Sequence, residues 1–323
     1  MDTSRRALLA LALVSAGVAR PGRAQRAYPS RPIRLVVAWA PTGSIDTVAR
    51  KVAQKLSEQL GQSVVVENRS GASGSIGAVE VARAAPDGYT LLAIDSTYGM
   101  MPFLQSRLPF NHAEAFRIIT ITAFTPVMVA VHRDSSWQTL QELTEAARRA
   151  PEKITYGSGG VGSSVHFATV VYELEAGVKL YHVPYRGGGE AVTAVLSKQV
   201  DVVFASPGSA VGGATAVLRP LAISGTARMA ALPDIPTFAE AGLPGYSVTH
   251  WSGLGAPRGT PPEIVDRLYT ETAKALAAPD MLEFFASIAC LPGGLTPAAA
   301  GHLLAEETLR WRRVVEAAGI QPQ

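Results

Sequence analysis

The chain is poor in charge, in cysteine and in the motifs that mark common enzymes. Charged residues make up 17% of its 323 residues, and Cys290 is the only cysteine. One cysteine excludes an internal disulfide and any metal site built from several cysteines, so we expect Cys290 to be a small buried apolar residue. The histidines lack metal-ligand spacing, and neither the G-x-S-x-G elbow of serine hydrolases nor a P-loop occurs. We predict no catalytic residue, no metal and no cofactor.

Long apolar runs are also missing, except for a short one at the N-terminus. Residues 1–24 combine the basic pair Arg5-Arg6, the apolar run Ala7 to Val18 and small residues around Ala24. This pattern predicts a signal peptide that is removed on export to the periplasm, because the run is too short to span a bilayer. The general secretory route is favoured, although Arg5-Arg6 loosely fits a twin-arginine signal.

The net positive charge of the chain comes from this predicted signal. Residues 1–24 carry four of the 29 basic and one of the 26 acidic residues, so the formal charge of the remainder is zero. A chain without a basic patch lacks the electrostatic footprint of nucleic-acid binding, and we predict no nucleic-acid partner.

The remaining chain alternates short apolar strands with helices. Apolar runs at Ile33 to Trp39, Val64 to Asn68 and Thr90 to Ile94 are each separated by helical periodicity, and the pattern restarts at Val127. We therefore predict an α/β, two-lobed periplasmic-binding-protein fold, in which each lobe is a mostly parallel sheet flanked by helices. The C-terminal helices need a sheet to cover, so lobe I is predicted at 25–126 plus 251–323 and lobe II at 127–250. The two crossings between the lobes would form a hinge.

Four loops rich in Gly, Ser and Thr follow apolar strands, and most of them open a helix. They are Pro41 to Asp46, Asp95 to Gly99, Gly157 to Ser164 and Pro184 to Gly189. Ligands of open α/β sheets bind beyond the carboxyl ends of strands, where unpaired N–H groups of helix N-termini favour an anion. One helix dipole contributes only about 0.3–1 kcal/mol, so several loops must act together. The predicted ligand-binding residues are Trp39, Thr42, Gly43, Ser44, Asp46, Ser96, Thr97, Ser158, Gly162, Ser163, Ser164, His166, Arg186 and Ser206.

Three of these residues have ordinary structural alternatives. Asp46 either caps the helix that it begins or orients waters or a ligand amine. His166 either donates to a ligand or packs locally. Arg186 either grips a carboxylate with its guanidinium or is a surface loop residue.

Nine short motifs follow one another in a fixed order along the chain after residue 27. They are Tyr28–Val37 (YPSRPIRLVV), Ala40–Asp46 (APTGSID), Val65–Arg69 (VVENR), Gly71-Ala72 with Gly77-Ala78, Pro86–Thr90 (PDGYT), Tyr156–Ser164 (YGSGGVGSS), His182–Gly187 (HVPYRG), Leu232–Thr237 (LPDIPT) and Glu240–Tyr246 (EAGLPGY). In these segments, from Tyr28 to the C-terminus, the chain resembles the substrate receptors of tripartite tricarboxylate transporters, the Bug-type receptors. The resemblance implies that the loops at 40–46 and 157–164 bind a ligand carboxylate. Thr42 and Trp39 depart from the family pattern and narrow the pocket mouth. The distal group of the ligand would meet Ser96 to Tyr98 and Ser206 to Ser209.

The predicted function is an extracytoplasmic receptor that binds a small mono- or dicarboxylate and delivers it to membrane permease subunits. A receptor that senses the ligand for a sensor kinase is the alternative, and free diffusion between membrane partners suits a monomer. A nucleotide-dependent oxidoreductase is a third hypothesis, because Gly157–Gly162 fits G-x-G-x-x-G. Its context is incomplete, since the next strand ends in Pro184-Tyr-Arg186 rather than in an acid that holds a ribose.

Overall fold

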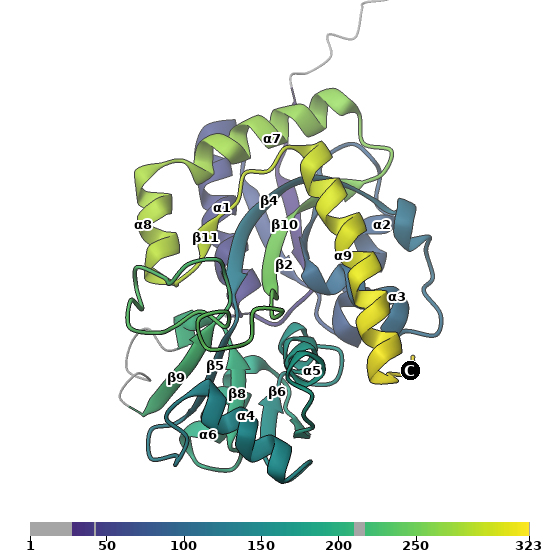
Figure 1. Cartoon of the computed structure of the whole chain (residues 1–323). Coiled ribbons are helices and arrows are strands. Elements are labelled where there is room, and N and C mark those ends of the chain that lie inside the picture. The colour runs from purple at the N-terminus through teal and green to yellow at the C-terminus, as the bar shows by residue number, and fades with distance from the viewer. Residues whose placement is uncertain (1–27, 42, 210–216, 323) are drawn as a thin grey trace, which may run out of the picture.

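The computed structural model describes residues 28–41, 43–209 and 217–322, which form two sheets flanked by helices (Figure 1). The predicted signal peptide at 1–24 and the predicted contact Thr42 lie outside the described residues. In spatial order, the first sheet contains β11 (Leu291–Pro292), β4 (Phe116–Pro126), β10 (Thr249–Pro257), β3 (Thr90–Asp95), β1 (Ile33–Val37) and β2 (Val64–Asn68). The second contains β7 (Tyr181–Pro184), β6 (Thr155–Ser158), β8 (Val202–Ala205), β5 (Met128–His132) and β9 (Leu218–Ile223).

Most strands in each sheet point the same way. In the first sheet β1 is parallel to β2 and β3, whereas β10 is antiparallel to both of its neighbours. In the second, β6 is parallel to β7 and β8, and β5 is the reversed strand. The predicted α/β architecture with two helix-flanked sheets is therefore confirmed. The strand β4 was not predicted, and the chain near Thr249 to Ser252, which begins the long strand β10, was predicted to be a crossing between the lobes.

Each sheet buries an apolar layer on both faces. On the first sheet, one core lies beneath α1 (Ser44–Leu60), α7 (Pro262–Leu276) and α8 (Pro279–Ser287), and the other beneath α2 (Ser75–Ala82) and α9 (Pro297–Ala318). On the second sheet, α4 (Leu140–Arg149) and α5 (Ser164–Ala176) cover one face and α6 (Gly188–Leu196) covers the other. Cys290 is buried in the core beneath α1, α7 and α8, as expected.

The helix α1 shows why these segments fold as they do. Val48, Val52 and Leu56 recur every four residues and are buried, so they form one apolar face against the sheet. The helix ends at Gly61, which adopts the left-handed conformation (φ 65°) that side chains disfavour. The same logic applies to α5, which ends at Gly177 with φ 62°.

Two connections bring the sheets together. Val127 alone separates β4 from β5, and it exchanges two hydrogen bonds with Ser224: its N–H donates to Ser224 Oγ (2.8 Å) and its carbonyl accepts from Ser224 N–H (2.7 Å). The chain returns at β10, whose first residue Thr249 pairs with Pro126. The division into the lobes 25–126 plus 251–323 and 127–250 stays a prediction.

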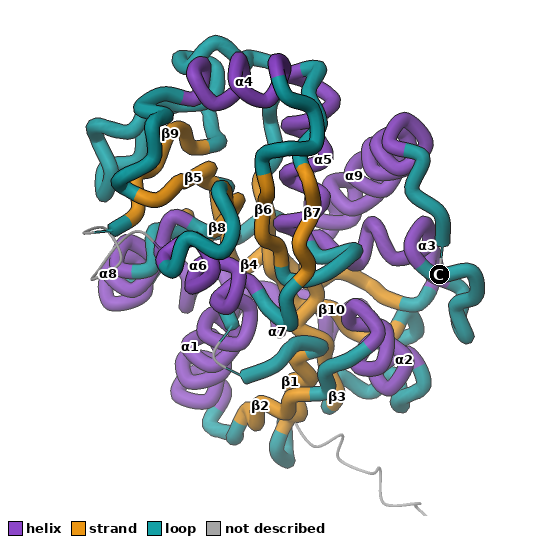
Figure 2. The backbone as a smooth tube through the Cα atoms, turned by 90° about the horizontal axis from the view of Figure 1, so that it is seen from below, coloured by secondary structure: helices purple, strands orange, loops and turns teal. Residues whose placement is uncertain are grey.

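The C-terminal helix α9 packs against both sheets. Figures 1 and 2 show it running past α5, and Trp311 on α9 lies edge-to-face against Phe167 on α5, with ring centroids 5.5 Å apart. Trp311 is 1% exposed and belongs to the apolar core of the second sheet. This helix therefore connects the end of the chain to the second sheet, whereas the helices before it, α7 and α8, cover only the first.

Candidate functional site

The turn after β1 leads into α1 without a side-chain cap. Gly43 is the N-cap residue, and both Gly43 and Ser44 are exposed. The first N–H groups of an α-helix have no partner within the helix, so this start offers exposed donors to an anion. Thr42, the predicted contact just before it, lies outside the described residues.

A buried network of polar side chains fixes this turn. The Asp46 carboxylate is 2% exposed and accepts hydrogen bonds from Asn68 Nδ2 (2.8 Å) and Arg50 Nε (2.9 Å). Asn68 Nδ2 also donates to the carbonyl of Trp39 (3.0 Å), which lies between β1 and the turn. Asp46 is thus engaged inside the protein, where it helps to hold the backbone of the turn in place.

Removing Asn68 tests this network. We expect Asn68→Ala to lower the free energy of unfolding by about 1–3 kcal/mol, because it leaves a buried carboxylate oxygen with one donor fewer. Gln54 on the exposed face of α1 also donates to a carboxylate, Glu58 Oε1 (3.2 Å), and is the matched control. Gln54→Ala should change stability by less than about 0.5 kcal/mol in urea unfolding. Equal losses in the two variants would contradict a structural role for the Asp46 network.

The end of β3 carries a carboxylate that the sequence analysis did not single out. Asp95 is 4% exposed and accepts hydrogen bonds from the Thr97 N–H (2.7 Å), the Thr97 hydroxyl and the Trp39 indole N–H. Burial raises the pKa of Asp95, while its donors oppose that shift. The predicted contacts Ser96 and Thr97 are buried, at 2% and 5% exposed, and the Thr97 hydroxyl is bonded to Asp95. In this structure these side chains stabilise the turn and do not face solvent.

The turn between β6 and α5 is shaped by two glycines and two histidines. Gly160 and Gly162 have φ values of 102° and 83°, a region that side chains disfavour. The Ser158 hydroxyl lies 2.6 Å from His182 Nε2, and the Gly162 N–H donates to His166 Nδ1 (3.3 Å). Ser163 caps α5 by accepting from the His166 N–H (3.3 Å), and Ser164 is the first residue of the helix.

Three stacked rings support this turn from below. Tyr156 stacks on His182 with centroids 4.8 Å apart, and His182 stacks on His166 at 4.4 Å. Burial and the neighbouring His182 lower the pKa of His166 to about 4, and burial also lowers that of His182, so both imidazoles are neutral at neutral pH. His166, a predicted ligand donor, uses Nδ1 to hold the turn. His182 was missed, because its role comes from a contact between β7 and β6 rather than from a motif.

The two remaining predicted contacts lie on other turns of the second sheet. Arg186 is exposed at the turn between β7 and α6, where its N–H donates to Glu190 Oε2 (3.1 Å). Ser206 follows β8, and its hydroxyl accepts from the Gly208 N–H (3.3 Å). The structure therefore groups Trp39, Asp46 and Thr97 around one turn and Ser158, Gly162, Ser163 and His166 around another. The turn that carries Arg186 adjoins the second group, because the Tyr185 N–H donates to the Ser158 carbonyl (2.9 Å), whereas Ser206 lies on a separate turn.

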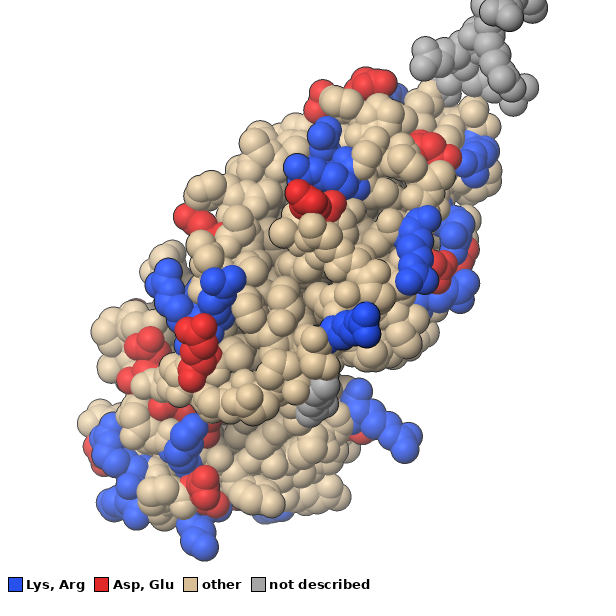
Figure 3. Space-filling model, turned by 90° about the vertical axis from the view of Figure 1, so that its right-hand side faces the viewer, with Lys and Arg blue, Asp and Glu red and all other residues tan. Residues whose placement is uncertain are grey.

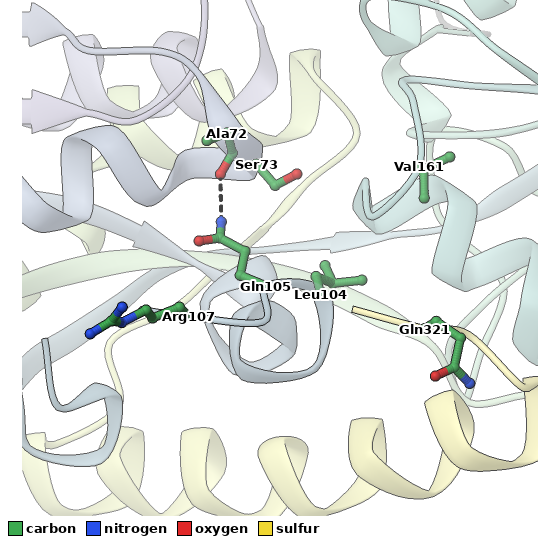
Figure 4. Close-up of a pocket in the computed structure, with 7 residues that line it drawn as sticks. All are labelled: Ala72, Ser73, Leu104, Gln105, Arg107, Val161 and Gln321. Carbon is green, nitrogen blue, oxygen red and sulfur yellow. Dashed lines mark hydrogen bonds between the residues drawn. The ribbon is translucent and has the colours of Figure 1, made fainter. Parts of the chain in front are cut away.

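The β6–α5 turn meets the first sheet across a cavity of about 300 Å³ (Figure 4). Val161 lies on one side and Ala72 and Ser73 on the other, where Gln105 donates to the Ala72 carbonyl (2.8 Å). The cavity is lined by Ala72, Ser73, Leu104, Gln105, Arg107, Val161 and Gln321. A methyl group on Gly162 would lie 2.9 Å from Leu104 Cδ1 and 3.5 Å from Ser73 Oγ, so a side chain at this position would have to displace the end of Leu104.

A short segment links this cavity to the β1 turn. Ser73 and Gly74 belong to the single turn η1 (Ala72–Gly74), and a methyl group on Gly74 would lie 3.6 Å from the Trp39 indole ring. The junction between the sheets therefore has Trp39 on one side of η1 and Gly162 on the other.

The surface charge is mixed, and the described residues contain neither a metal-binding group nor a membrane-spanning helix. On the face shown in Figure 3, charged side chains of both signs stand in small mixed groups, with broad uncharged areas between them. Within residues 28–41, 43–209 and 217–322 there is no group of three or more His, Cys, Asp or Glu arranged to hold a metal ion. Over the same residues, none of the helices is long and apolar enough to cross a membrane.

Comparison with known proteins gives consistent matches over nearly the whole chain. The model of a family described as tripartite tricarboxylate transporter family receptor matches residues 48–320. The UPF0065 protein in the tcbD-tcbE intergenic region of Pseudomonas sp. (strain P51) is 38% identical over 315 residues, covering 96% of this chain and 93% of that protein. Protein BugT of Bordetella pertussis is 32% identical and covers 97% of both chains.

Two similar solved structures carry carboxylates in their descriptions. R. palustris Rpa4515 with adipate has a TM-score of 0.84 at 32% identity, covering 92% of this chain and 100% of that one. MatC from Rhodopseudomonas palustris with bound malate has a TM-score of 0.79 at 30% identity, covering 89% of this chain and 100% of that one.

Proposed function

The chain belongs to the receptor family of the tripartite tricarboxylate transporters, and from this premise we propose that it binds a small carboxylate between its two sheets and delivers it to membrane permease subunits. We also propose that the chain is exported to the periplasm through its N-terminal signal, by the general secretory route, and that it acts there as a monomer. We further propose that Val127 and β10 form the hinge about which the lobes close.

One observation carries the proposal. The turns after β1 and β6 each open a helix, α1 and α5, and their surroundings meet at η1. In the β6 turn the Ser158 hydroxyl is bonded to His182 and the Gly162 backbone N–H donates to His166 Nδ1, so the backbone of the turn is held in place where the first sheet approaches. A carboxylate that bridges helix starts from two lobes gains several charge-assisted hydrogen bonds, each contributing about 1.5–3 kcal/mol.

Electrostatics and the similar structures support an organic anion. The segment after the signal is formally neutral and lacks a basic run, so binding must come from oriented N–H and O–H donors rather than from a cationic patch. Proteins similar to this chain along its length are described with adipate and with malate, both dicarboxylates.

A thermal-shift series on the protein without its signal tests the proposal. We expect adipate, malate or a related acid to stabilise the protein by about 2.7 kcal/mol at a hundredfold excess over Kd, which raises Tm by several degrees. ATP and NAD serve as controls for the nucleotide-dependent alternative. Stabilisation by a nucleotide, with silence across mono- and dicarboxylates, would refute the receptor function.

A further inference from the structure

A row of polar side chains runs along one face of β10 and its neighbours. Ser252 pairs with Asp95 on β3, and His250 pairs with Thr125 on β4. Between them, Trp251 donates its indole N–H to Glu307 on α9, so it points toward that helix. Because side chains alternate along a strand, His250 and Ser252 face the opposite side of the sheet, which α1, α7 and α8 cover. We refer to Asp95, Ser252, His250 and Thr125 as the β10 polar row.

Within this row His250 has unused hydrogen-bonding capacity. Thr125 Oγ1 lies 3.3 Å from Cys290 Sγ, Ser252 Oγ lies 3.1 Å from Thr122 Oγ1, and Asp95 is bonded to Trp39 and Thr97. Both ring nitrogens of His250 are buried, and neither has a hydrogen-bond partner among the described residues. Buried polar atoms are almost always bonded, and a neutral imidazole offers one donor and one acceptor. The unpartnered ring therefore points to a group that residues 28–41, 43–209 and 217–322 do not supply.

The position of His250 is also between two segments predicted to meet the distal end of the ligand. On one side, Ser252 connects it to Asp95, which begins the turn Ser96 to Tyr98. On the other side, Thr125 contacts Cys290, whose Sγ lies 3.7 Å from the Ile288 carbonyl. That carbonyl would be 2.7 Å from a methyl group on Gly208, in the turn that Ser206 opens. His250 is thus linked through Thr125, Cys290 and Ile288 to the place where the turn after β8, in the second sheet, approaches the first.

We propose that His250 binds the second carboxylate of the ligand and makes the receptor selective for dicarboxylates over monocarboxylates. This inference rests on the proposed function and assigns the specificity of the same site. The first carboxylate is held by the N–H groups of the turns, and His250 supplies a donor at the hinge end. A carboxylate beside an imidazole favours its protonated form, so the pair binds as an ion pair.

This arrangement couples binding to a proton. Burial lowers the pKa of His250 to about 4 in the free protein, so the imidazole is neutral at neutral pH. Two titratable groups lie on elements that pack near His250. The Asp95 carboxylate accepts hydrogen bonds from Trp39 and Thr97, and burial raises the pKa of the Cys290 thiol. The bound carboxylate raises the pKa of His250, and the protein then takes up a proton on binding. Affinity for a dicarboxylate should therefore increase as the pH falls from the bound toward the free pKa, by up to about tenfold per pH unit.

Calorimetric titration of adipate and hexanoate, acids of equal chain length, tests the inference. In two buffers of different ionisation enthalpy at pH 7, we expect the wild-type protein to bind adipate at least about tenfold more tightly than hexanoate, with proton uptake for adipate only. His250→Gln should lose about tenfold or more in adipate affinity and all of the proton uptake, with hexanoate affinity almost unchanged. His302→Gln, an exposed histidine on α9, is the control and should leave both values unaltered.

The outcomes separate this inference from the proposed function. Tight binding of carboxylates with the same adipate preference and proton uptake in His250→Gln overturns the role of His250 and leaves the receptor function standing. Absence of carboxylate binding by the wild-type protein overturns both. Should His250→Gln fail to fold, the buffer dependence of the wild-type protein decides, because adipate binding without proton uptake contradicts the ion pair.

Discussion

We expect Gly162→Ala to weaken ligand binding by about 100-fold, a loss of roughly 2.7 kcal/mol in binding free energy. Gly162 has φ 83°, and its added methyl group would lie 2.9 Å from Leu104 Cδ1. The left-handed conformation costs a non-glycine residue about 1–2 kcal/mol, and overpacking at a close contact costs about 1–3 kcal/mol. The contact with Leu104 arises where the β6–α5 turn meets the first sheet, so the substitution opposes the arrangement that binds the ligand.

A second glycine separates backbone strain from this contact. Gly177 ends the same helix with φ 62°, and no atom lies within 4 Å of a methyl group placed on it. Gly177→Ala should therefore lose about 1–2 kcal/mol of stability and keep its ligand affinity. Calorimetry on both variants, with the stability of each from urea unfolding, makes the comparison. If Gly162→Ala binds as tightly as Gly177→Ala, the turn is a connector and not part of the site.

The second large effect is on stability. Trp311→Ala is expected to lower the free energy of unfolding by about 3–5 kcal/mol, because it removes a fully buried aromatic side chain and leaves a cavity that the surrounding residues fill only in part. The indole packs against Phe167 and lies in the core shared with the second sheet. Its loss removes the contact by which α9 joins the two sheets.

Leu309 supplies the matched control, because it lies on the same helix and is 51% exposed. Leu309→Ala should cost less than about 0.5 kcal/mol. Unfolding in urea, followed by far-ultraviolet circular dichroism, measures both variants under the same conditions. A similar loss in the two would mean that α9 is stabilised by its own helix propensity rather than by packing.

Much of the fold can be predicted from local patterns. The strands β1, β2 and β3 are short apolar runs followed by Gly/Ser turns, and the helices α1, α4 and α9 show regular apolar spacing, so their positions follow from the sequence. The strand β4 was missed although its run of isoleucine and threonine is typical of a strand. It lies at the end of the predicted first segment of lobe I, where only the last residues, near Thr125 to Val127, were interpreted, as a crossing between the lobes.

The strand β10 shows where such prediction fails for a physical reason. Its sequence THWSGLGAP contains glycine and proline, which indicate a loop. In the structure a methyl group on Gly253 would lie 2.5 Å from the Thr120 carbonyl, so glycine is required by the close approach of β4. A pairing partner more than a hundred residues away cannot be identified from the sequence around Gly253.

In the candidate site, too, some residues could be predicted from local patterns and others could not. The turns with Gly43 and Gly162 were identified because they follow strands and open helices. Asp95, His182 and His250 were not, because each acquires its role from a tertiary contact: Asp95 with Trp39, His182 with Ser158, and His250 through the strand that pairs it with Thr125. Predicted contacts such as Thr97 and Ser158 have their hydroxyls engaged within the protein, which residue type alone does not reveal.

The single residue between β4 and β5 limits how the two sheets can move. With only Val127 between Pro126 and Met128, and with both of its backbone hydrogen-bonding groups tied to Ser224, this connection has no spare length. The sheets are therefore unable to slide apart along this path, and any large displacement has to be a swivel in which a few backbone torsions near Val127 change while the distance between the strand ends stays constant. A residue inserted beside Val127 would lengthen this connection and allow the distance between the strand ends to change.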